Sequence, residues 1–187
     1  EPRPGEEIFG MTMITLKGKT ILVADTNVQD FPSPERLVKV SKSCVRVARL
    51  FGFDPKVAFL SHSTFGKPIS KNTKHVRDAI DLLKKEKVDF DFDGEMQPDV
   101  ALNPIYQEIY PFSKIVGNAN ILIMPALHSA AISTKLMKVF GGGKLIGPLL
   151  IGLGSPIEVA PLRASTSEIL NLASIAAYSS DVIDYSN

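Results

Sequence analysis

The sequence predicts an α/β protein with three layers, α/β/α, around a mostly parallel sheet. Several short segments are apolar almost throughout, which is typical of strands that are covered on both faces. Segments with helical periodicity separate them, which favours parallel strands joined by helical crossovers. The composition agrees, because 187 residues with 44% hydrophobic and 22% charged side chains can bury a sizeable core.

The first well-marked helix is expected over residues 34–50. Ser33 is placed to cap it, and Pro34 occupies the first helical position, where a missing N–H group costs nothing. Apolar residues follow at spacings of three, four and seven, and Gly52 is suited to end the helix. Cys44 lies within this apolar stripe, so we interpret it as a core residue rather than a nucleophile.

The remaining elements alternate along the chain. Strands are expected over residues 20–24, 56–60, 119–124 and 145–151, and helices over residues 72–85, 130–140 and 167–178. Residues 89–95 alternate acidic and aromatic side chains, so Phe90 and Phe92 are expected on one face of a strand. Ligands of such sheets bind beyond the carboxyl ends of the strands. The segments to inspect are therefore 25–27, 61–67, 93–97, 125–129 and 152–163.

Charge and cysteine content exclude several classes of partner. The chain has 21 basic and 20 acidic residues, so no bulk field attracts nucleic acid or an anionic membrane. Its apolar stretches are shorter than the roughly 20 residues of a membrane-spanning helix. With a single cysteine no intrachain disulfide can form, which favours the cytoplasm. The chain begins without a methionine, and we expect it to be part of a larger polypeptide.

Residues 61–67 are a candidate anion site. Three hydroxyl side chains, a glycine and a lysine follow the expected strand at 56–60, and such a turn can hold a phosphate through hydroxyl and backbone donors. The spacing is not that of a P-loop. The alternative is a turn in which Ser and Thr make local hydrogen bonds and cap the next helix.

Other polar residues leave two interpretations open. Asp93 and Glu95 could act as acid–base groups or metal ligands, or could lie at a solvated strand edge. Arg163 and Glu168 flank the start of the last helix. Arg163 could bind a phosphate and Glu168 could act as a general base, but a surface arginine and an acid in the first helical turn explain the two residues equally well. The three histidines lack metal-ligand spacing, so no metal site is expected. Residues 141–143, three glycines, are expected to end a helix rather than to bind a nucleotide.

Four ordered blocks resemble the C-terminal half of the phosphotransacetylase family: residues 57–66, 93–101, 117–125 and 147–156. Residues 24–26 and 32–34 fit the start of the same pattern. Within the family, residues 3–10, 60–63, 93–96, 121–125 and 130–133 are most similar to the phosphotransacetylase-like C-terminal domain of bacterial hybrid NADP-dependent malic enzymes. The resemblance implies an architecture like that of isocitrate and isopropylmalate dehydrogenases.

The resemblance also implies roles for single residues. Active transacetylases of the family place a serine–arginine pair before the last helix and an acidic residue just after that pair. Arg163 matches the arginine, but Leu162 stands in place of the serine, and Glu168 matches the acid if one residue is deleted. A second family arginine falls at Val139, whereas Lys135 matches a family lysine. Arg163 and Glu168 are then vestigial catalytic candidates, and acyl-CoA or acyl phosphate is expected to bind at Ser61, Ser63, Thr64, Lys135 and Arg163.

The function implied is that of a regulatory and oligomerisation domain of an NADP-dependent malic enzyme, which converts malate to pyruvate and CO₂. The expected partners are acetyl-CoA or an acyl phosphate, a second copy of the chain and the N-terminal malic enzyme domain. No cofactor is expected in this chain, while NADP and Mg²⁺ or Mn²⁺ would serve the parent enzyme. The alternatives are an active phosphate acetyltransferase fragment and a relative that acts on butyryl or other acyl groups.

The resemblance divides the chain in two. Residues 1–163 are expected to be the C-terminal subdomain of the phosphotransacetylase-like module. Residues 164–187 are expected to be a terminal helix that packs back on the missing N-terminal subdomain.

Overall fold

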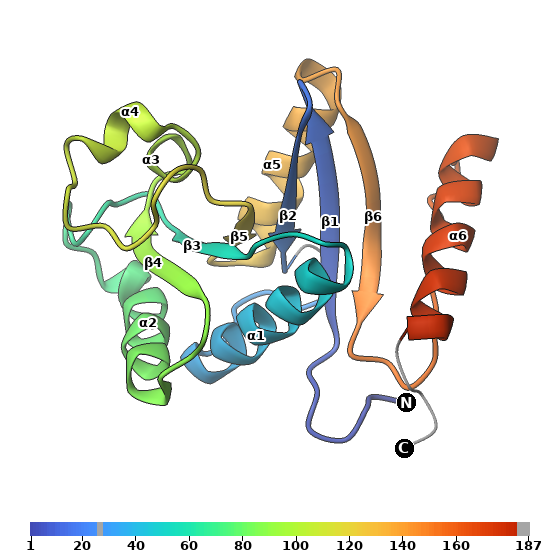
Figure 1. Ribbon diagram of the computed structural model, residues 1–187, viewed down its shortest axis with the longest axis horizontal. Helices are drawn as coiled ribbons and strands as arrows, with labels where there is room; N and C mark the ends of the chain where they lie inside the picture. Colours follow the sequence, from blue (N-terminus) through green and yellow to red (C-terminus); the bar gives the residue numbers. More distant parts are fainter. Residues whose placement is uncertain (26–27, 183–187) are drawn as a thin grey trace.

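Six strands form one mixed sheet in the order β4-β3-β5-β2-β1-β6 in the computed structural model, which describes residues 1–25 and 28–182 (Figure 1). The strands are β1 (Phe9–Leu16), β2 (Lys19–Ala24), β3 (Lys56–Leu60), β4 (Asp91–Met96), β5 (Ile121–Ile123) and β6 (Lys144–Ile151). Strands β4, β3, β5 and β2 are parallel, whereas β1 is antiparallel to both of its neighbours. The predicted α/β class with a mostly parallel sheet is confirmed.

Helices cover both faces of this sheet. They are α1 (Pro34–Leu50), η1 (Lys71–Thr73), α2 (Lys74–Glu86), α3 (Pro98–Leu102), α4 (Pro104–Gln107), α5 (Leu127–Phe140) and α6 (Thr166–Val182). One buried apolar cluster joins α1 and α2 to the strands, and a second joins α3 and α5 to them. Helix α6 lies beside β6 at the edge of the sheet, with Leu172 in the first cluster (Figure 1).

Helix α1 has the bounds that its local signals predict. The Ser33 hydroxyl accepts the N–H of Arg36 at 3.2 Å, and Pro34 opens the first turn. Gly52 follows the helix with φ of 78°, a conformation that favours glycine. Cys44 is fully buried, which raises the pKa of its thiol and confirms it as a core residue.

Strand β1 is an element that the sequence analysis did not predict. It forms a hairpin with β2 through Lys17 and Gly18, and both residues have positive φ angles, 50° and 76°. A two-residue turn in which both φ angles are positive has a backbone twist that matches the right-handed twist of the two strands it joins. This hairpin is also what makes the sheet mixed, because β1 runs against its neighbours.

Strand β4 contains the predicted alternation only in part. Phe90 and Phe92 both pack against the first apolar cluster, with ring centroids 5.9 Å apart. Asp91 is exposed as expected, but Asp93 and Glu95 are buried instead of lying at a solvated edge. The strand therefore carries two acids into the interior.

Parts of two sequence predictions lie outside the described residues. These are positions 26–27 of the strand-end segment 25–27, and positions 183–187 of the expected terminal unit. Within the described residues, no helix is both long and apolar enough to cross a membrane.

Candidate functional site

A buried polar cluster lies at the carboxyl ends of β3 and β4. The hydroxyl oxygens of Ser61 and Ser63 are 3.2 Å apart, and Ser63 donates to Glu95 Oε1 at 2.9 Å. Thr64 Oγ1 accepts the N–H of Gln97 at 3.1 Å. All three hydroxyl side chains are buried, so the predicted trio lies together with its hydroxyl groups engaged inside the protein.

Glu95 is the centre of this cluster, and its side chain is fully buried. Arg77 of α2 places Nη1 3.1 and 3.2 Å from the two carboxylate oxygens, and the N–H of Gly66 donates to Oε1 at 3.1 Å. Arg77 also donates to Thr73 Oγ1 and to the carbonyl of Ser70. These charge-assisted bonds tie α2, β4 and the loop after β3 together.

This arrangement gives Glu95 a structural role in the cluster. Sequence reasoning missed Arg77, although a buried carboxylate requires a charged or hydrogen-bonding partner. The sequence alone could not indicate Arg77 as that partner, because the burial of Glu95 was not known before the structure.

Asp93 and the histidines also make local contacts. Asp93 accepts the backbone N–H groups of Gly94 and Lys114 at 2.9 and 2.7 Å. His75 Nε2 lies 2.9 Å from the carbonyl oxygen of Pro125. Over residues 1–25 and 28–182, no three His, Cys, Asp or Glu side chains are placed to hold a metal ion together.

Lys135 belongs to a second place in the fold, a cavity of about 160 Å³ between α5, β6 and α6. Lys138 and Glu168 also line it, and Lys138 Nζ is 3.2 Å from Glu168 Oε1. Gly147 and Pro148 of β6 line the cavity as well. Two lysines beside a small cavity can attract an anion.

Glu168 and Ser165 form a capping box at the start of α6. The N–H of Ser165 donates to Glu168 Oε2 at 2.8 Å, and the N–H of Glu168 donates to Ser165 Oγ at 3.2 Å. These bonds from Ser165, together with Lys138, lower the pKa of Glu168 to about 2. A carboxylate with so low a pKa is a weak general base near neutral pH.

The predicted binding residues therefore do not form a single site. Ser61, Ser63 and Thr64 follow β3, whereas Lys135 of α5 lines the cavity beside β6 and α6. Arg163 lies in an exposed turn before α6, and Leu162 beside it is fully exposed. Val139 on α5 is also exposed, so both positions that depart from the family pattern face solvent.

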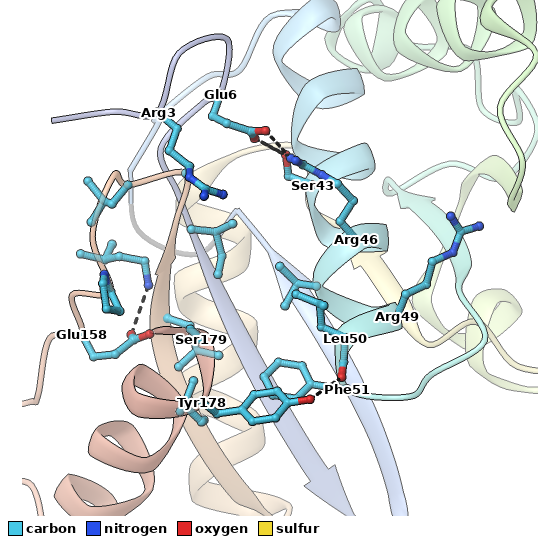
Figure 2. A pocket seen from close by; sticks show the side chains of 18 residues that line it. Arg3, Glu6, Ser43, Arg46, Arg49, Leu50, Phe51, Glu158, Tyr178 and Ser179 are labelled. Carbon is cyan, nitrogen blue, oxygen red and sulfur yellow. Dashed lines mark hydrogen bonds and ion pairs between the residues drawn. The ribbon is translucent and has the colours of Figure 1, made fainter. Parts of the chain in front are cut away.

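A larger cavity, about 360 Å³, lies between the N-terminal segment, α1, β6 and α6 (Figure 2). Glu158, from the loop after β6, reaches its wall and accepts the N–H of Leu150 at 3.2 Å. Burial raises the pKa of Glu158 to about 7. Sequence reasoning missed this cavity. The position of Glu158 between two apolar residues, Ile157 and Val159, could have indicated that its carboxyl is partly buried.

The mixed six-stranded sheet and the helices on both of its faces define an α/β module, and comparison with known proteins identifies its family. Residues 1–177 match the phosphate acetyl/butaryl transferase family, to which the chain belongs. This match confirms the predicted resemblance to phosphotransacetylases, and the relatives below confirm the resemblance to malic enzymes.

Three individual proteins illustrate the relationship. An NADP-dependent malic enzyme of Rhizobium meliloti is 45% identical over 95% of this chain. A phosphate acetyltransferase of Clostridium acetobutylicum is 34% identical over 83% of it. A phosphotransacetylase structure from Streptococcus pyogenes superposes with a TM-score of 0.88 at 30% identity, over 95% of this chain and 55% of the other. The chain spans 23% of the malic enzyme and 47% of the acetyltransferase.

Proposed function

We propose that the chain is a regulatory and assembly module of an NADP-dependent malic enzyme, which binds acetyl-CoA or an acyl phosphate without efficient transacetylation. One observation carries the proposal. The positions that match the family's catalytic serine and second arginine hold exposed apolar side chains, Leu162 and Val139. Losing a hydroxyl donor and a phosphate-binding arginine each removes transition-state stabilisation of about 3 kcal/mol. The chain can still bind the ligand after it has lost these two catalytic groups.

The state of Glu168 supports the same conclusion. Its carboxylate is held by Ser165 and Lys138, and its low pKa disfavours the acceptance of a proton from a CoA thiol. In this proposal the ligand biases a distant active site through a two-state change in subunit packing. NADP and the divalent metal belong to the rest of the parent polypeptide, which we place in the cytoplasm.

A transacetylase assay tests the catalytic half of the proposal. The chain and the full-length parent are expected to show no turnover of acetyl-CoA with phosphate at enzyme-like rates. The double variant with Leu162→Ser and Val139→Arg is expected to raise any residual rate. Fast turnover by the unmodified protein would contradict the proposal.

A titration of acetyl-CoA against malate oxidation by the full-length parent tests the regulatory half. The oxidation rate is expected to depend on acetyl-CoA, and Lys135→Ala is expected to weaken that dependence. Lys84→Ala is the matched control, because Lys84 lies on the exposed surface of α2, where it pairs with Asp81. A rate that is indifferent to acetyl-CoA at all concentrations would reject regulation by this ligand.

Assembly is the second role that we propose, through the exposed side of α5. Four large apolar residues on this helix repeat at spacings of four, three and one, and each is more than half exposed: Ile132, Leu136, Val139 and Phe140. An apolar stripe of this kind is typical of a helix that packs against another surface. We propose that a second copy of the chain covers it.

An active phosphate acetyltransferase fragment is the second candidate function. The retained Arg163 and the 34% identity with the Clostridium acetobutylicum acetyltransferase favour it. Under this alternative Arg163 binds the phosphate, so Arg163→Ala is expected to abolish turnover. An unchanged rate in that variant would reject the alternative.

A further inference from the structure

Helix α5 carries an exposed apolar face that continues beyond the helix itself. Ile132, Leu136 and Phe140 repeat at four-residue intervals on the side of the helix that points away from the core. His128 extends this row by one more step toward the amino end of the helix. Phe31, which is 69% exposed, packs on the His128 ring with the two centroids 5.7 Å apart. A continuous exposed row of this kind is typical of a surface that packs against another protein.

The two ends of this face carry opposite charges. At the amino end of α5, the Asp30 carbonyl accepts the N–H of Leu127 at 3.1 Å, which places this acid beside the first turn of the helix. At the carboxyl end, the chain enters β6 at Lys144, which pairs with Thr15 of β1, two residues before Lys17 in the β1–β2 hairpin (Figure 1). Asp30 and both lysines are exposed. The face is therefore acidic at one end and basic at the other.

We infer that two copies of the chain pack α5 against α5 in opposite directions, around a two-fold axis that passes beside Leu136. The inference rests on the proposed assembly of the chain and specifies its geometry. Positions at equal distances before and after Leu136 then face each other, so Ile132 of one copy lies opposite Phe140 of the second copy. On the same count, the end that carries Asp30 lies opposite Lys144 of the second copy. Dimers with two-fold symmetry are by far the commonest protein oligomers.

Charge decides between the two directions in which the helices can pack. In a parallel pair, Asp30 would meet Asp30 and Lys144 would meet Lys144, and like charges placed together across an interface repel. The opposite direction places an acid against a lysine at each end of the interface. A second copy of the chain thus matches both the apolar row and the charges at its two ends, which is why we commit to a second copy as the partner.

Disulfide formation between introduced cysteines measures the direction of packing. In the 187-residue chain, Leu136→Cys is expected to give a covalent dimer under oxidation, because the axis brings the two copies of this position together. Ile132→Cys is the matched control on the same helix. Its two copies would lie eight residues apart along the helix axis, about 12 Å, which exceeds the roughly 7 Å between Cα atoms that a disulfide spans. Cys44 is fully buried, so the introduced cysteine is the exposed one.

A mixture of two variants provides a second measurement, which stays informative if Leu136→Cys weakens the dimer. Chains with Ile132→Cys, mixed with chains that carry Phe140→Cys, are expected to form a mixed covalent dimer, because the two positions face each other. Neither variant alone is expected to cross-link. In a parallel pair, each variant alone would cross-link with itself instead.

Charge reversal tests the two ends of the interface. Asp30→Lys and Lys144→Glu are each expected to weaken the dimer about fivefold in sedimentation equilibrium, because each places like charges together at both ends. The double variant is expected to recover the original affinity, since every acid–lysine contact forms again with the charges exchanged. Lys85→Glu is the control, because Lys85 is exposed on α2, which packs with the other apolar cluster.

The outcomes separate this inference from the assembly on which it rests. A chain that is dimeric, but that forms no disulfide in Leu136→Cys or in the mixture, assembles in another way and overturns the inference alone. Self-cross-linking of Ile132→Cys, or a double charge variant that stays as weak as the single ones, has the same meaning. A chain that is monomeric at all concentrations rejects the inference together with the proposed assembly.

Discussion

Glu158 links the stability of the chain to pH through one half-buried carboxyl. Its pKa in the folded protein, about 7, lies above the ordinary value of 4.5, so folding favours the protonated form. The stabilising effect is therefore complete below pH 4.5 and is lost as pH rises to about 7. Each pKa unit corresponds to about 1.4 kcal/mol, but solvent screening at this partly open site reduces the total effect to about 1 kcal/mol.

The Glu158→Gln variant tests this effect. Its free energy of unfolding is expected to exceed that of the unmodified chain by about 1 kcal/mol at pH 8, with little difference at pH 4.5. Urea unfolding at the two pH values measures both quantities. Equal stability of the two proteins at pH 8 would contradict the buried setting of this carboxyl.

The cluster around Glu95 joins three elements, so its effect belongs to the packing of α2 against the sheet. Glu95→Ala leaves the Arg77 guanidinium, the Ser63 hydroxyl and the Gly66 N–H without their acceptor. Removing one partner of a buried ion pair costs about 3 kcal/mol. Urea unfolding is expected to show a loss of that size.

Asp91→Ala is the control for Glu95→Ala, because Asp91 lies on the same strand and is exposed. Its effect on unfolding is expected to stay within about 0.5 kcal/mol. Similar losses in both variants would mean that β4 is sensitive to any substitution, and that the cluster has no special role.

The elements that sequence reasoning located are those whose signals are local. The bounds of α1 were predictable because Ser33, Pro34 and the apolar repeat lie within one segment. Strand β1 was missed, although Lys17 and Gly18 before a second apolar run are a hairpin signal. Its own run mixes Gly, Thr and Met with apolar residues, so strand periodicity alone was weak.

The candidate site was predictable only in part, and for a similar reason. Ser61, Ser63 and Thr64 were located by their position after a strand, which is a local property. Their partners come from other segments: Glu95 is 32 residues from Ser63, and Arg77 is 18 residues from Glu95. No local pattern shows that these hydroxyl groups are engaged with a buried carboxylate.

Self-association concerns the whole molecule, and the apolar stripe on α5 makes it testable. If a second copy covers this stripe, Leu136→Lys is expected to weaken the dimer at least tenfold, because a lysine would be buried against apolar side chains. Sedimentation equilibrium of the chain measures the change. Ile69→Lys is the control, since Ile69 is exposed outside the stripe. A monomeric unmodified chain at all concentrations would reject this assembly.

Strand β6 is the last strand of the sheet, and among the described residues no strand lies on the far side of its backbone. Glu158 covers part of that side, because its carboxyl accepts the N–H of Leu150 and its backbone forms a bridge with Leu149. An uncovered strand edge is a template on which another chain can add a strand. By occupying this edge Glu158 hinders strand addition, and the hydrogen bond from Leu150, which favours the ionised carboxyl, holds it there above neutral pH as well.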